Sequence, residues 1–266
     1  DDRPRATEHW PAGGQGVVIR GNTLNRLQGD AIVAHGTESA LIEENVVTVG
    51  NLAGKDFLGG DRNCAVGIWA WNSNNTLIQR NEVSGYRFGQ SATDGCDGTG
   101  FGVDYEQDGT VIQYNYSHDN EGGFVLLCSD DEPHGVEVRY NLSVDDGKVI
   151  NASPCKFPTF GTFDDIRMYN NTFVMPRPYT ALQTMRLPAI NNAGAFLFAN
   201  NIVYATSPQS DPLACGDLCA NNLFYNLPPA GTEFVVDDPL FEDISWRGRG
   251  RNEAGAAFQI RAGSPA

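Results

Sequence analysis

The sequence predicts an all-β solenoid of about eight stacked coils, and three observations lead to this fold class. The first is a recurring phrase: an apolar residue, two variable residues, an asparagine, one more residue and usually a second apolar residue. The second is the composition, because 30 glycines and 14 prolines in 266 residues interrupt long helices, whereas 41% hydrophobic residues are too many for a disordered chain. The third is the lack of any amphipathic pattern of ten or more residues between the phrases.

The asparagine of the phrase is the element that repeats most strictly. Successive asparagines are 23, 36, 34, 26, 30, 30 and 21 residues apart, which fits a coil of about 21 to 23 residues that carries insertions. They are Asn22, Asn45, Asn81, Asn115, Asn141, Asn171, Asn201 and Asn222. Asparagine tolerates the left-handed conformation, and its amide both donates and accepts hydrogen bonds. We therefore expect a ladder of asparagine side chains that joins one coil to the next.

Charge and cysteine content limit the partners and the compartment. The formal net charge is −15, so neither nucleic acid nor an anionic membrane surface is expected as a partner. No run approaches the ~20 apolar residues of a membrane span. Six cysteines without CxxC spacing predict disulfides in a secreted or extracellular protein rather than a metal site. No cofactor is expected, although Asp94 and Asp97 leave a calcium site open as an alternative to turn chemistry.

Three longer segments resemble a known family. They are Gly67–Asn72 with Thr76–Asn81, then Asp97–Asp104, and then Gln113–Phe124. Over about residues 17–226 the chain resembles the secreted right-handed parallel β-helix proteins of the pectate-lyase-like superfamily, many of which are carbohydrate-active. This resemblance implies a right-handed parallel β-helix and a carbohydrate substrate.

The same resemblance divides the chain into three parts. Residues 1–16 form an N-terminal extension, residues 17–226 form the β-helix, and residues 227–266 resemble the closing segment of such helices. The family usually carries further coils and a cap, whereas no capping helix precedes Asn22. A missing N-terminal part of the same precursor, or a capping partner, is therefore expected to cover the first coil.

The coil period also predicts the disulfides. Cysteines at similar offsets before the asparagines of adjacent coils should lie above one another. The expected pairs are Cys64 with Cys96, Cys128 with Cys155, and Cys215 with Cys219.

The longest insertions indicate where a site could be built. Residues 50–63 and 84–99 both precede the same strand of their coils. Counting back from the asparagines aligns three segments on that strand: Val33-Ala34-His35, Trp69-Ala70-Trp71 and Val103-Asp104-Tyr105. We expect a cleft over this strand.

Acidic residues gather beside the expected cleft. Cleavage of a glycosidic bond needs two carboxyl groups, ~5–5.5 Å apart for retention and ~6.5–9.5 Å apart for inversion. The hypothesis pairs Asp104, aligned with Ala34 and Ala70 of earlier coils, with Glu121 or Asp119 of the next turn. The alternative is that these acids only bond the backbone of turns.

Aromatic and basic residues complete the candidate substrate site. Trp69 and Trp71 lie two apart and face the same side, with Tyr105 on the next coil, so they form either a platform for sugar rings or part of the core. His118 could orient a carboxyl group, and the same role is open to His35. Arg87 binds a uronate or pairs with Asp94 or Asp97. For both histidines a structural role is the alternative.

Three functions fit these residues. Paired acids and aromatic side chains on one face favour a glycoside hydrolase that cleaves a polysaccharide or oligosaccharide. A polysaccharide lyase acting on a uronate would need a base such as Lys148, Arg139 or Arg167. A non-catalytic carbohydrate-binding solenoid would keep the aromatic residues without depending on the acids. The products separate them, because a lyase leaves unsaturated ends, a hydrolase leaves only reducing ends, and a binding module leaves neither.

Overall fold

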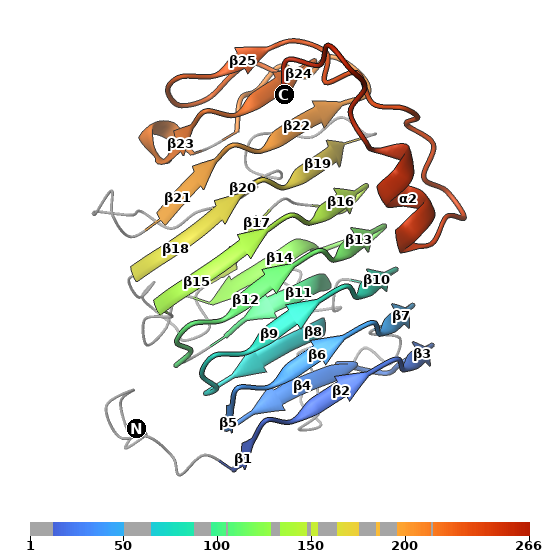
Figure 1. The fold of residues 1–266 in the computed structure, drawn as a ribbon, viewed down its shortest axis with the longest axis vertical. Coiled ribbons are helices and arrows are strands. Elements are labelled where there is room, and N and C mark those ends of the chain that lie inside the picture. Colours follow the sequence, from blue (N-terminus) through green and yellow to red (C-terminus); the bar gives the residue numbers. More distant parts are fainter. Residues whose placement is uncertain are drawn as a thin grey trace, which may run out of the picture.

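The structure is a computed structural model, and it confirms the parallel β-helix. It describes residues 13–50, 65–87, 97–104, 106–128, 134–147, 150–153, 164–175, 185–186, 196–213 and 215–266. The coils stack along the longest axis of the molecule, from the N-terminal coil at one end to the C-terminal coil at the other (Figure 1). Most coils pass through three strands, which join three long parallel sheets that we name A, B and C in the order in which the chain meets them.

The strands of each sheet follow the order of the coils. Sheet C contains β4 (Ile32–His35), β8 (Val66–Trp71), β11 (Thr99–Val103), β14 (Gly123–Cys128), β17 (Ile150–Ser153) and β20 (Met185–Arg186). Sheet A contains β2 (Val18–Arg20), β6 (Leu41–Glu43), β9 (Leu77–Gln79), β12 (Val111–Gln113), β15 (His134–Arg139), β18 (Asp164–Tyr169), β21 (Phe196–Ala199) and β23 (Cys219–Ala220). Sheet B contains β3 (Thr23–Asn25), β7 (Val46–Thr48), β10 (Glu82–Ser84), β13 (Tyr116–His118), β16 (Leu142–Val144), β19 (Thr172–Met175), β22 (Ile202–Ala205), β24 (Leu223–Tyr225) and β25 (Val235–Val236). A short fourth sheet pairs β1 (Gly14–Gln15) with β5 (Thr37–Glu38).

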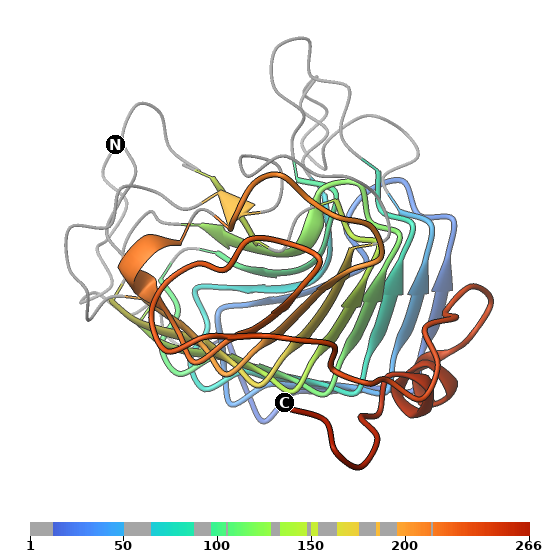
Figure 2. The ribbon, with the colours of Figure 1, turned by 90° about the horizontal axis from the view of Figure 1, so that it is seen from above.

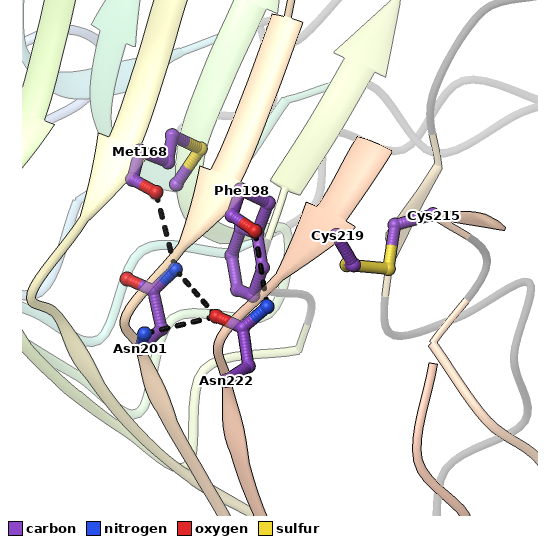
Figure 3. Close-up of a disulfide and its surroundings, with 6 residues drawn as sticks. All are labelled: Met168, Phe198, Asn201, Cys215, Cys219 and Asn222. Atoms are coloured by element: carbon purple, nitrogen blue, oxygen red, sulfur yellow. Dashed lines mark hydrogen bonds between the residues drawn. A yellow bond between two sulfur atoms is a disulfide. The ribbon is translucent and has the colours of Figure 1, made fainter. Parts of the chain in front are cut away.

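The asparagine ladder lies at the turn from sheet A to sheet B and matches the prediction at all eight positions. From Asn45 onward, each ladder amide oxygen accepts hydrogen bonds from the backbone N–H and the side-chain Nδ2 of the ladder asparagine one coil earlier. Asn115 Oδ1, for example, accepts from Asn81 at 2.9 and 3.1 Å. Each Nδ2 from Asn45 onward also donates to the carbonyl three residues before the preceding rung, as Asn222 does to Phe198 at 3.0 Å (Figure 3). From Asn45 to Asn222 the ladder residues are at most 3% exposed. Their amides therefore replace hydrogen bonds that the turning backbone cannot make.

The left-handed residue of this turn is not the ladder asparagine, as the sequence suggested, but the residue before it. We call the residues at this position the corner residues. They are Gly21, Glu44, Arg80, Tyr114, Tyr140, Asn170, Asn200 and Asn221, with φ between 53° and 69°. The ladder asparagine keeps its amide turned inward because its neighbour makes the turn.

A second, shorter ladder at the turn from sheet B to sheet C was not predicted. Asn120 Oδ1 accepts from Tyr86 N at 2.9 Å, and Asp146 Oδ1 accepts from Asn120 N at 3.1 Å and from Asn120 Nδ2 at 2.9 Å. Burial raises the pKa of Asp146 to about 6, although hydrogen bonds from Ser117 and Ser143 oppose the shift. The recurrence of Ser-x-Asp-Asn and Ser-x-Asp-Asp at 117–120 and 143–146 was the available signal.

The apolar residue that opens each phrase forms the core. Ile42, Ile78, Ile112 and Val138 are fully buried on sheet A, and they continue into Met168, Phe198 and Cys219 above them. Phenylalanines extend the stacking through the interior, with ring centroids of Phe124 and Phe173 5.8 Å apart and those of Phe173 and Phe198 5.6 Å apart. Apolar side chains of several types thus fill the interior from one coil to the next.

The C-terminal segment does not simply close the last coil. Strand β25 still pairs with β24, and β1 pairs with β5, so the strands extend beyond both ends of the predicted span 17–226. After β25 the chain turns back along the outside of sheet B, where helix α2 (Arg251–Ala257) packs against β13 (Figure 1). Phe241 and Phe258 anchor this segment, with ring centroids 5.3 Å apart, in a cluster with Tyr116, Val144 and Val174 of sheet B.

One predicted disulfide is confirmed. Cys215 and Cys219 are bonded across the short helix η1 (Gly216–Leu218), with their Cα atoms 5.7 Å apart (Figure 3). Cys64, Cys96 and Cys155 lie outside the described residues, as does the side chain of Cys128. The pairs of Cys64 with Cys96 and of Cys128 with Cys155 therefore stay predictions. Within the described ranges, no helix is long and apolar enough to span a membrane.

The ladder makes a prediction about stability. Replacing Asn115 by alanine removes the acceptor of two Asn81 hydrogen bonds and the donor to the Ile78 carbonyl, all in the buried interior. Because each unsatisfied buried group costs ~1–3 kcal/mol, Asn115→Ala should lower the free energy of unfolding by at least about 2 kcal/mol in chemical denaturation. Asn74→Ala, at a half-buried turn position, should change it by less than about 0.5 kcal/mol. Equal tolerance of both changes would contradict the ladder's role.

Candidate functional site

The outer face of sheet C carries the predicted aromatic residues. Strand β4 pairs with β8 in the predicted register, with Ala34 opposite Ala70 and His35 opposite Trp71. Ala70 and its neighbour Ile68 are completely buried, whereas Trp69 and Trp71 alternate with them and are only half-buried. The two indoles therefore point outward. Of the two alternatives left open by the sequence, they form a surface platform and are not part of the core.

These rings form a continuous stack. The rings of His35 and Trp71 lie 4.5 Å apart between centroids, at an interplanar angle of 27°. Trp69 and Trp71 follow at 6.3 Å and 10°. His35 is exposed, so one end of the stack is open to solvent. A row of nearly parallel rings on a rigid sheet offers flat apolar faces to the C–H faces of sugars.

The outer face of sheet C is concave. Gly67 and Ile68 both face inward, because a Cβ atom at Gly67 would collide with the core residue Val83 and Ile68 belongs to the core. The outward residues on either side of this pair converge, since a Cβ atom at Gly102 would lie 3.1 Å from both Val66 Cγ1 and Trp69 Cβ. Figure 2 shows the resulting bend of the sheet C strands, seen along the stack.

The predicted register of Asp104 is wrong by one residue. Val103, not Asp104, pairs with Ala70, and Val103 is fully buried in the core. The turn between sheets C and A holds one residue more in this coil than in the preceding one, because Val111 pairs with Leu77. An alignment that counts residues back from the ladder asparagine could not detect this extra residue. Asp104 therefore does not replace a core alanine; it follows β11 as a half-buried residue whose N–H donates to Ala70 O at 3.3 Å.

The structure does not bring Asp104 together with the acids predicted to be its partners. Asp104 follows the C-terminal end of β11, whereas Asp119 and Glu121 precede the N-terminal end of β14. The two ends of these strands are separated by about five residues, or roughly 16 Å along a straight strand, which exceeds the range for a glycosidase pair. Asp119 has a left-handed φ of 57° and contacts His118, and Glu121 is an exposed turn residue.

Other polar groups of the concave face were not predicted. Asp30, just before β4, accepts a hydrogen bond from Val66 N at 2.8 Å, and burial raises the pKa of its carboxyl group despite opposing contributions from Val66 and Trp69. The Thr99 hydroxyl is buried without a hydrogen-bond partner in the described part of the chain. Asp97, by contrast, was named from the sequence as a possible calcium ligand or partner of Arg87; it immediately precedes Gly98 and β11, has φ of 49° and is half-buried. No repeat marks Asp30, so periodicity could not reveal it.

His118 belongs to a cluster under the C-terminal segment. Its Nδ1 lies 2.7 Å from Asp119 and its Nε2 lies 3.5 Å from Glu82, whose other oxygen accepts a hydrogen bond from Arg251 N at 2.8 Å. Burial favours the neutral ring, but the Asp119 and Glu82 carboxylates outweigh it and raise the pKa of His118 to about 9. The structure thus supports the structural alternative for His118.

Several predicted site residues lack a described position or a described contact with the concave face. Tyr105 and Asp94 lie outside the described residues. Arg87 is exposed at the edge of the second insertion, three residues after β10. No cluster of three or more His, Cys, Asp or Glu that could hold a metal ion occurs among the residues with described positions.

Known proteins share this fold and part of this sequence. A family model described as "Right handed beta helix region" matches residues 12–173. The lacto-N-biosidase of Bifidobacterium longum subsp. longum is 29% identical over 199 residues, which cover 71% of this chain and 11% of that protein. The crystal structure of the GH136 lacto-N-biosidase from Eubacterium ramulus is 27% identical, with a TM-score of 0.54, over 71% of this chain and 28% of that one.

A more distant match extends further along the chain. The tailspike protein of E. coli bacteriophage HK620, solved in complex with a pentasaccharide, covers 83% of this chain and 41% of its own, with a TM-score of 0.51. At 13% identity this match shows the shared fold alone. The present chain spans only a minor part of the length of each of these relatives.

The His118 cluster predicts how stability depends on pH. Because folding raises the pKa of His118 to about 9, its contribution is complete below the ordinary value of 6.5 and is lost as the pH rises through 9. The melting temperature should fall by roughly 5 °C more between pH 6.5 and pH 9.5 in the wild type than in His118→Gln. His134→Gln, at an exposed position of β15, is the control and should keep the wild-type slope. Parallel slopes for the wild type and His118→Gln would contradict this role.

Proposed function

The chain belongs to the right-handed β-helix family, and from that premise we propose that it is the part of a glycoside hydrolase that binds and cleaves an oligosaccharide. Two relatives of detectable sequence identity are both named lacto-N-biosidases, which supports this class of activity. We further propose that this protein has an activity like that for which these relatives are named. One confirmed disulfide, between Cys215 and Cys219, supports the proposal that the protein is exported.

The observation that carries the proposal is the juxtaposition on the concave face of sheet C. Trp71 lies in the middle of the ring stack, and Asp104 follows the residue that pairs with Ala70, so it occupies the position next to Trp71 in the following coil. A sugar ring stacked on the indoles would thus lie within reach of a carboxyl group. Binding one ring beside a fixed carboxyl group supplies part of the arrangement that glycoside cleavage requires, which is a bound sugar between two carboxyl groups.

The second carboxyl group is not assigned to the acids at the opposite end of the sheet C strands. Asp30 precedes β4 and Asp97 precedes β11, so both lie at the N-terminal end of this sheet, as Asp119 and Glu121 do, about five residues or more along the strands from Asp104. Glu121 and Asp119, at the turn before β14, are not proposed as catalytic residues, and Glu121 serves as a control position below. Two-carboxyl chemistry of this kind requires no cofactor.

The lyase alternative is less well supported by two of its three candidate bases, and the third, Lys148, lies outside the described residues. Arg139 lies on sheet A, where it pairs with Glu137 at 2.6 Å and donates to Tyr169 at 2.9 Å. Arg167 lies on sheet A as well and pairs with Asp165 at 2.7 Å. Both cations are therefore engaged on a different wall of the stack from the aromatic rings. A non-catalytic binding module would share the ring stack, so only the carboxyl variants separate it from a hydrolase.

The carboxyl group of Asp104 makes the first functional prediction. Asp104→Asn should lower kcat for release of reducing sugar by about 10³-fold or more, because a principal catalytic group is lost. The melting temperature should stay within a few degrees, since Asp104 is only half-buried. Glu121→Gln is the matched control and should keep the wild-type kcat. Full activity of Asp104→Asn would move the catalytic centre elsewhere.

The stack of His35, Trp71 and Trp69 rings makes the second functional prediction. Trp71→Ala should raise KM roughly tenfold, because the sugar loses its central stacking surface while the carboxyl groups stay in place. Kinetics on an oligosaccharide substrate measure this, and Phe234→Ala, an exposed aromatic residue beside β25, is the control. An unchanged KM in Trp71→Ala would remove the stack from the substrate site.

A further inference from the structure

Two corner residues between sheets A and B are conspicuous for their side chains. Three of the eight corner residues are asparagine and one is glycine, which suits a left-handed backbone. Tyr114 and Tyr140, in adjacent coils, adopt φ of 55° and 54°, a conformation that bulky residues rarely adopt. Such strain persists only where the surroundings enforce it, and it is concentrated at binding and catalytic sites.

The two tyrosines form an open platform. Their rings are stacked, with centroids 5.2 Å apart and an interplanar angle of 8°, and the residues are 45% and 44% exposed. The Arg80 guanidinium lies 5.9 Å from the Tyr114 ring centroid, and Tyr169 meets Tyr140 edge-on at 6.3 Å. The rings are thus held in place from both sides while part of their surface stays in contact with solvent.

Helix α2 turns this platform into a cleft. A cavity of about 530 Å³ lies between the two tyrosines and the helix, within the ~300–1,000 Å³ typical of ligand sites. Its inner wall includes Tyr116 and Leu142 of sheet B, and Phe258 follows the helix on the outer wall. The cleft exists because the C-terminal segment folds back beside β13 instead of ending at the last coil.

The rim of the cleft offers hydrogen bonds that the protein does not use. The side-chain amides of Asn170, Asn252 and Gln259 line it, all three residues are exposed, and none of these amides is hydrogen-bonded to another described residue. An amide both donates and accepts, as a sugar hydroxyl does. Arg251 is the one cation among the lining residues, which is too little charge for a polyanion.

We propose that this cleft is a second carbohydrate-binding site, separate from the concave face of sheet C. Stacked rings would take the apolar face of a sugar, and the free amides would take its hydroxyl groups. Figure 2 shows α2 and sheet C on different sides of the stack, so the two sites do not share a wall. The proposal does not depend on catalysis at sheet C, because it uses neither the indoles nor the acids of that face.

Binding of neutral sugars tests the proposal directly. The probes are lacto-N-biose, lactose, cellobiose and maltose, and the readouts are saturation-transfer NMR and calorimetry on the whole chain. The double variant Tyr114→Asn with Tyr140→Asn should bind the preferred sugar at least tenfold more weakly. Asparagine occupies the same corner at Asn170, so this variant should keep or raise the melting temperature.

A second variant and a control locate the binding. Asn252→Ala, on the exposed side of α2, should weaken binding several-fold without touching the stacked coils. Phe234→Ala, an exposed aromatic residue outside both sites, is the control and should leave this binding unchanged. The proposal is overturned if the wild type binds none of the four sugars at millimolar concentration, or if the double variant binds as tightly as the wild type. It is equally overturned if Phe234→Ala loses as much binding as the double variant, or if the double variant changes only the oligomeric state in sedimentation, which would assign the cleft to a protein partner.

Discussion

One buried amide per coil holds this structure together. At the turn from sheet A to sheet B the left-handed corner residue redirects the chain, and the asparagine after it bonds both to the next rung and to a carbonyl of the preceding coil. An alanine there would leave several buried groups without partners, each at a cost of ~1–3 kcal/mol. The amide also fixes the register, because its bonds form only when successive coils are aligned residue on residue.

The outer faces follow from that register. Since every coil is aligned at the ladder, residues that lie equally far from the ladder asparagine form rows that run along the stack. A substitution in one coil therefore places the new side chain directly beside the equivalent side chain of the next coil. The pair His35 and Trp71 arises this way on sheet C, and the pair Tyr114 and Tyr140 arises at the corner. Asp104 follows Trp71 in the next coil although it lies one residue further from its ladder asparagine, because the turn after β11 holds an extra residue. Two candidate sites on separate walls therefore share a single scaffold.

The repeat explains why part of this structure was predictable and part was not. The ladder and the parallel sheets follow from features that recur at every coil. Alternation along β8 also placed Trp69 and Trp71 on one face, but it could not tell whether that face was outside or in the core. The position of Asp104 does not, because the turn after β11 accommodates one extra residue without disturbing the ladder. The cleft beside Tyr114 was also beyond reach, since α2 meets β13 across more than 130 residues of sequence and no period relates them.

Stacked coils also explain how the corner tolerates tyrosine. A bulky residue in the left-handed region costs on the order of 1–3 kcal/mol, and in a solenoid that cost is borne locally by the coil and its two neighbours. Tyr114 and Tyr140 lie in the middle of the stack, where ladder bonds from Asn81 to Asn171 hold both coils from above and below. The first coil lacks such support on one side among the described residues, and there the corner is Gly21, which carries no strain. The strained rings thus occur where the ladder is best able to offset them, which is the condition under which a strained residue can be kept for binding.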